Sequence, residues 1–96
     1  MLNKAIEVKK TMLNQIEQYL NGEITRRDLD DIAEEYYTEN AHIIDGTEFY
    51  KVYSQIIIDA CLVDVEEPGD EEKQENHFHG EMEKAHKLLK PLCDNS

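Results

Sequence analysis

Three histidines near the C-terminal end of the chain are the first candidates for chemistry. His79 and Glu83 are four residues apart, and Glu83 and His86 are three apart, so a helix would carry them on neighbouring turns beside His77. The order departs from the HExxH zinc motif, and Cys93 lies too far along to complete a ligand set. We therefore interpret the histidines as partly exposed groups on an acidic surface, with a metal site as the alternative.

Other patterns of catalytic residues do not occur in the sequence. There is no glycine-rich phosphate loop, no GxSxG motif and no CxxC motif. Acidic pairs are frequent, but none stands in an evident pocket with an apolar wall that would separate two carboxyl pKa values. We expect a protein that is not an enzyme and that uses no cofactor and no metal.

Carboxylates dominate the charge of the chain and are concentrated in two places. The 22 acidic and 10 basic residues give a net charge of −12, and residues 23–45 alone hold eight acids and two bases. A second run places seven acids among the twelve residues from 64 to 75. Because clustered like charges repel one another, selection for solubility alone would tend to spread them, which favours recognition of a basic partner. The alternative is a solvated helix face and a solvated loop. The candidate partner-binding carboxylates are Asp31, Glu34, Glu35, Glu66, Glu67, Asp70, Glu71 and Glu72.

An adjacent pair of tyrosines, Tyr36 and Tyr37, lies within the first acidic segment. A helix buries one residue of such a pair easily and turns the next about 100° away, here towards Asp30 and Glu34. A half-exposed tyrosine surrounded by acids has the composition of an interface anchor, which makes Tyr37 a further candidate binding residue. Alternatively, both rings close the edge of the core.

Composition limits the classes of partner and the cellular location. Such a negative field repels nucleic acid and anionic membranes, so we expect neither as a partner. No run of some 18 apolar residues is long enough to span a bilayer. The first residues lack the apolar core of a secretory signal, and the two cysteines do not suggest a disulfide framework. We therefore expect a cytoplasmic protein with reduced thiols, forming one domain over residues 1–96.

The first two helices are predicted from apolar periodicity and from their end signals. Residues 3–20 have a helical period, with Lys9 on the apolar face, where it must snorkel or lie past the end of the core. Asn21–Gly22 ends this helix, and Thr25 with Asp28 forms a capping box for the next, over about 26–39. Its predicted buried stripe is Leu29, Ile32, Ala33 and Tyr36.

Two further helices are predicted after a buried connector at residues 43–44. Asp45 and Glu48 form a second capping box for a helix over about 46–65, which is apolar on most sides and therefore central. A strand over residues 56–58 is the alternative. After an acidic loop, a last helix over about 73–90 ends at Pro91. Its core seam is Phe78, Met82, Ala85, Leu89 and Leu92. Four amphipathic helices with short connections predict an all-α fold, a four-helix bundle.

Three stretches of the sequence define the layout further: the turn YLNGEIT at 19–25, the acidic stretch at 64–72 after the third helix, and the closing LLKPL at 88–92. With these stretches, the layout resembles the small bacterial immunity proteins of the colicin D type and of contact-dependent growth inhibition. The resemblance implies a bundle that binds and blocks a toxin nuclease by presenting carboxylates to an active site made for phosphates. The run at 66–72 would fill that role, with the acids of the second helix as a second patch.

Three hypotheses follow, from different functional classes. The first is an immunity-type inhibitor of a basic toxin nuclease. The second is a helical adaptor or regulatory subunit in a larger assembly, which predicts an exposed apolar patch and a stable oligomer. The third is a small metalloprotein that uses the histidines between residues 77 and 86.

Overall fold

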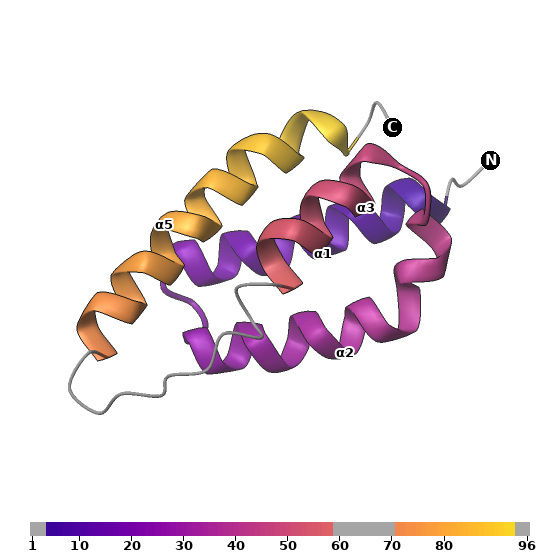
Figure 1. Ribbon diagram of the computed structural model, residues 1–96. Helices are drawn as coiled ribbons and strands as arrows, with labels where there is room; N and C mark the ends of the chain where they lie inside the picture. The colour runs from indigo at the N-terminus through magenta and orange to yellow at the C-terminus, as the bar shows by residue number, and fades with distance from the viewer. Residues whose placement is uncertain (1–3, 59–70, 94–96) are drawn as a thin grey trace.

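The computed structural model describes residues 4–58 and 71–93, and this part of the chain is helical, with four α-helices and no strand. Helix α1 packs against α2 and α5, while α3 packs against α2 and α5 from the other side, so the four helices form a closed bundle (Figure 1). The predicted all-α four-helix bundle is confirmed. The elements are α1 (Lys4–Leu20), α2 (Arg26–Ile44), α3 (Glu48–Tyr53), the π-helical turn η1 (Ser54–Ile58), α5 (Glu71–Leu89) and the 3₁₀ turn η2 (Lys90–Leu92).

The connection between α1 and α2 follows the local signals in the sequence. Gly22 has φ of 79°, its N–H donates to the carbonyl of Tyr19, and the N–H of Glu23 donates to the carbonyl of Gln18. This pair of bonds is a Schellman motif, which satisfies the last carbonyls of the helix. Thr25 then caps α2 in a capping box with Asp28. The turn therefore fixes where the acidic helix starts.

The glycines of this protein predict two opposite effects on stability. Gly80 lies within α5 with open space around the position of a Cβ, so Gly80→Ala should stabilise the fold by about 1 kcal/mol through helix propensity. Gly22→Ala should cost about 1 kcal/mol or more, because an alanine at φ of 79° is strained. Urea unfolding of both variants measures this, and an unchanged or lower midpoint for Gly80→Ala would contradict it.

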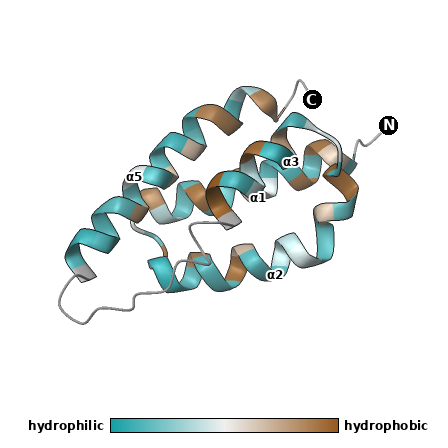
Figure 2. Ribbon diagram, in the orientation of Figure 1, coloured by the Kyte–Doolittle hydropathy of each residue, from teal (hydrophilic) through white to brown (hydrophobic). Residues whose placement is uncertain are grey.

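The core collects the apolar faces of all four helices. The predicted seam of α5 is confirmed in that Phe78, Met82, Ala85 and Leu89 are all buried, while Leu92 is half-buried. In Figure 2 the first turns of α5 are almost entirely hydrophilic, so the seam acts mainly further along the helix. The fully buried side chains of α1 and α2 are Val8, Lys9, Met12, Ile16, Leu29 and Ile44.

Two burial predictions for α1 and α2 are wrong. Lys9 is fully buried and does not snorkel to the solvent, because α1 lies between α2 and α5 and both neighbours cover its flanks. Ile32 was expected in the buried stripe, yet 39% of it is exposed. A step of three residues from Leu29 turns Ile32 about 60° to one side, whereas a step of four turns Ala33 about 40° to the other side, which is the buried one.

The junction between α2 and α3 also differs from the prediction. Helix α2 continues to Ile44, so residues 40–44 form its last turn rather than a connector. The cap of α3 is Thr47 instead of Asp45. The Thr47 hydroxyl donates to the carbonyl of Ile44 over 2.7 Å and accepts from the N–H of Tyr50 over 3.1 Å. One hydroxyl thus satisfies the end of one helix and the start of the next, with Gly46 at φ of 86° between them.

The segment predicted as a central helix over 46–65 is shorter and less regular within the described residues. Helix α3 has six residues and passes directly into the π-helical turn η1, so a strand at 56–58 is excluded. Its buried positions are Phe49, Tyr53 and Ile57, one face only, while Val52 and Ile56 are half-buried. Helix α3 packs against α2 and α5 rather than lying at the centre of the bundle, and residues 59–65 of the prediction lie outside the described residues.

The last helix begins and ends close to its predicted bounds. Helix α5 starts at Glu71, two residues before the prediction, and gives way at Leu89 to the 3₁₀ turn that contains Pro91. None of the helices described is long and apolar enough to cross a membrane.

Candidate binding surface

The outer face of α2 forms an acidic surface along two turns of the helix. Its inward positions are held by Leu29 and Ala33, which are 0% and 1% exposed, so positions 31, 34 and 35 turn outwards. A shallow open hollow runs along this face. We call its lining residues the α2 acidic face: Asp31, Glu34, Glu35, Thr38 and Glu39.

The carboxylates of the α2 acidic face carry uncompensated charge. All four are exposed, and the ion pairs found among residues 4–58 and 71–93 involve other groups. Thr38 contributes no competing donor, since its hydroxyl donates back to the carbonyl of Glu34 over 2.8 Å. Arg26, one of the two arginines at the start of α2, reaches Glu75 of α5 instead. Like charges held on one face without counter-charges keep a local negative potential, which attracts cations.

Tyr37, the predicted interface anchor, is half-buried and faces α3 rather than lying free among acids. Its ring stacks on Tyr50 and Tyr53 at centroid distances of 6.0 and 5.9 Å. Its hydroxyl lies 3.0 Å from the Ser54 Oγ and donates to the Tyr50 hydroxyl over 3.3 Å. Tyr36 is half-buried as well. The arrangement favours the alternative in which both rings close the edge of the core, with Tyr37 tying α2 to α3.

Of the second acidic run, residues 64–75, the structure describes only residues 71–75. Glu66, Glu67 and Asp70 lie outside the described residues. Glu71 begins α5 but its side chain is not described, and Glu72 is exposed in the first turn. The structure therefore brings Asp31, Glu34 and Glu35 together on one face of α2, while Glu72 lies on another helix, α5, and residues 66–70 lie outside the described residues.

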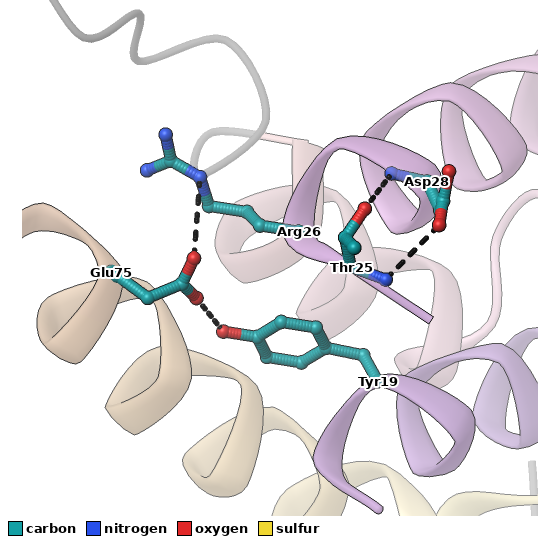
Figure 3. Close-up of polar contacts among 5 residues, drawn as sticks. All are labelled: Tyr19, Thr25, Arg26, Asp28 and Glu75. Carbon is teal, nitrogen blue, oxygen red and sulfur yellow. Dashed lines mark hydrogen bonds and ion pairs between the residues drawn. The ribbon is translucent and has the colours of Figure 1, made fainter. Parts of the chain in front are cut away.

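Glu75, which the sequence grouped with the acidic run, serves an internal contact instead. Figure 3 shows its carboxylate between the Tyr19 hydroxyl, which donates to it, and Arg26, whose Nε lies 4.0 Å away. Arg26 also lies over the Phe78 ring, 5.9 Å from its centroid. Burial, and then the bond to Glu75, raise the pKa of Tyr19 well above its ordinary range. Glu75 thus links α1, α2 and α5.

The histidines are divided between different contacts. His79 Nδ1 lies 3.1 Å from Glu83 Oε1 on α5, and its ring packs near Tyr19. His86 Nε2 lies 2.9 Å from Glu17 Oε1, which joins α5 to α1, while His77 is exposed. Across the described ranges no three histidine, cysteine or carboxylate side chains are arranged to hold a metal ion.

Sequence reasoning missed one acidic residue of the hollow, Glu39, and the exposure of Ile32. The spacing i, i+4, i+8 that starts at Asp31 and passes through Glu35 would have found Glu39. Comparison of the chain with protein-family models, curated proteins and solved structures found no match.

Proposed function

We propose that this chain is an acidic immunity-type inhibitor, which binds a basic toxin nuclease and blocks its active site. The observation that carries the proposal is the α2 acidic face, where four exposed carboxylates form no ion pair with any described residue. A solvated helix that served solubility alone would be stabilised by lysine or arginine at i+4, and α2 has none beyond its first turn.

The mechanism is replacement of substrate phosphates by carboxylates. Successive acids at positions 31, 35 and 39 are one helical turn apart, about 6 Å along the axis. A nuclease active site holds lysine and arginine side chains for phosphates, and each can instead form a charge-assisted hydrogen bond with a carboxylate. Opposite fields also accelerate the encounter, so capture of the toxin is fast and weakens with salt. The protein performs no reaction; it occupies the site.

Charge reversal on α2 tests the proposal with a matched control. Glu35→Lys with Glu39→Lys should weaken binding of the basic toxin domain encoded beside this gene by about 100-fold or more at about 0.15 M salt. The control, Glu7→Lys with Glu23→Lys, makes the same change in net charge at exposed sites elsewhere and should change the affinity only a few-fold.

Binding is measured by titration calorimetry, and protection is measured by cleavage of the nuclease's substrate. Both double variants should keep the helical circular dichroism of the parent, because all four positions are exposed. Equal loss of binding in the two double variants would show that only the net charge matters. A neighbouring gene without any toxin, or a neighbour that does not bind, would overturn the proposal.

The adaptor hypothesis is less well supported by the same surface. It requires a contiguous apolar patch, and among the described residues the large exposed apolar side chains are Ile32 and Leu88. These lie on α2 and α5, on either side of α1 in Figure 1. Light scattering separates the two functions, since an inhibitor of this kind is expected to be monomeric when free and an adaptor to be a stable oligomer.

A further inference from the structure

Ile32 lies at the margin of the α2 acidic face and is the apolar side chain nearest to it in the helix register. It is 39% exposed, although Leu29 and Ala33 on the same helix are buried. The helical neighbours of Ile32 at i−4, i+3 and i+7 are Asp28, Glu35 and Glu39, and all three are exposed. The exposed part of this aliphatic side chain is apolar area that a partner can bury, beside charges that a basic partner can pair with.

This face of α2 has no described covering. The helix packs on α1 and α3 through its opposite side, and the hollow beside Ile32 is open to solvent. From Asp31 to Glu39 the hollow extends about 12 Å along the axis, two turns of helix. Among residues 4–58 and 71–93, the face therefore offers an exposed apolar side chain and a parallel acidic row.

We propose that this face receives a basic amphipathic helix of the partner, with an aliphatic side chain of that helix packing on Ile32. Charge complementarity requires lysine or arginine opposite the acidic row, and an aligned helix repeats its cations every turn, the repeat of positions 31, 35 and 39. The inference rests on the proposed function, since it specifies the element through which the basic partner contacts the same surface.

A helix fits this face better than an extended segment, because the partner must turn a basic row and an apolar row of side chains towards α2 at the same time. On a helix, a basic row and an apolar row can lie on adjacent stripes, as Ile32 and the acids do on α2. In an extended strand the side chains alternate by about 180°, so a separate apolar row would point away from the contact. Recognition of an amphipathic helix by a helical surface is an established mode.

The test uses a synthetic peptide as the probe and two matched apolar variants. The peptide is an alanine-based helix of about 20 residues with lysines at i, i+4 and i+8 and leucines on the adjacent stripe. Ile32→Ala should weaken its binding about fivefold, because part of an aliphatic side chain no longer becomes buried. Leu88→Ala, which changes a similarly exposed aliphatic residue (44%) on α5, should leave the affinity within twofold. Fluorescence anisotropy of a labelled peptide measures both.

The outcomes separate this inference from the proposed function. Equal affinities for Ile32→Ala and Leu88→Ala overturn the inference, as does equally tight binding of a peptide of the same composition whose lysines alternate with period two. If either result is obtained and Glu35→Lys with Glu39→Lys still weakens binding of the toxin domain, the inhibitor proposal stands without the helical occupant. If that double variant binds the helical peptide like the parent, the helical occupant is ruled out, whereas the inhibitor proposal is overturned only if the same double variant also binds the toxin domain like the parent.

Discussion

Phe49→Ala is expected to lower the free energy of unfolding by about 3–5 kcal/mol, the largest effect of any substitution considered for this protein. Phe49 is fully buried, and its ring stacks on Tyr53 at a centroid distance of 5.9 Å. Helix α3 has only six residues, too few to be stable alone, so this side chain is a main anchor of α3 to the bundle. Since a domain of this size is stable by about 5–15 kcal/mol, the variant should be close to unfolding.

Urea unfolding followed by circular dichroism measures the loss, with two comparison variants. Phe49→Leu keeps most of the volume and should lose about 1 kcal/mol, which guards against a variant that does not fold. Ile32→Ala removes a large apolar side chain that is 39% exposed and should change stability by less than about 0.5 kcal/mol. A similar loss for Phe49→Ala and Ile32→Ala would contradict the assigned core.

Glu75→Ala should lower the free energy of unfolding by about 2 kcal/mol, although glutamate at the start of an acidic helix would ordinarily be dispensable. The substitution leaves the Tyr19 hydroxyl without its acceptor in a residue that is only 6% exposed. It also removes the carboxylate near Arg26, although that longer contact is partly exposed and contributes less. The contact joins three helices, so its loss affects their mutual packing.

A second glutamate of α5 provides the control for this effect. Glu81, on the same helix, forms no ion pair with any described residue. Glu81→Ala should therefore keep the free energy of unfolding within about 0.5 kcal/mol of the parent. A double-mutant cycle of Glu75→Ala with Tyr19→Phe, measured by thermal and urea unfolding, isolates the contact. Additive effects of the two substitutions would show that the hydrogen bond contributes nothing to stability.

The same hydrogen bond predicts the alkaline pH dependence. Because the pKa of Tyr19 is raised in the folded state, its stabilisation is fully present below about pH 10, the ordinary tyrosine value, and is lost as the pH rises further. Tyr19→Phe should therefore reduce the loss of stability above pH 10 relative to the parent. Parallel pH profiles for the two proteins would contradict the assigned burial and hydrogen bond.

What the sequence by itself determined is the part of the fold set by short-range signals. Thr25 with Asp28, and Gly22 after a helical period, specify a helix start and a helix stop through hydrogen bonds within a few residues. The seam from Phe78 to Leu89 specifies a buried face because its period belongs to one helix. The same register predicted correctly that positions 31, 34 and 35 point outwards, and hence the acidic face of α2.

Only the tertiary structure decided the features that depend on which helix lies next to which. Asp45 and Thr47 both have good capping side chains, and the hydroxyl that also reaches Ile44 became the cap. Glu75 and Tyr19 are 56 residues apart, so no local pattern distinguishes this carboxylate from the rest of its acidic run. Burial of Lys9 and exposure of Ile32 depend on how closely neighbouring helices cover each edge of a helix. Hydrogen bonds within a turn are encoded in adjacent residues, whereas coverage and long-range pairing exist only once the helices have packed.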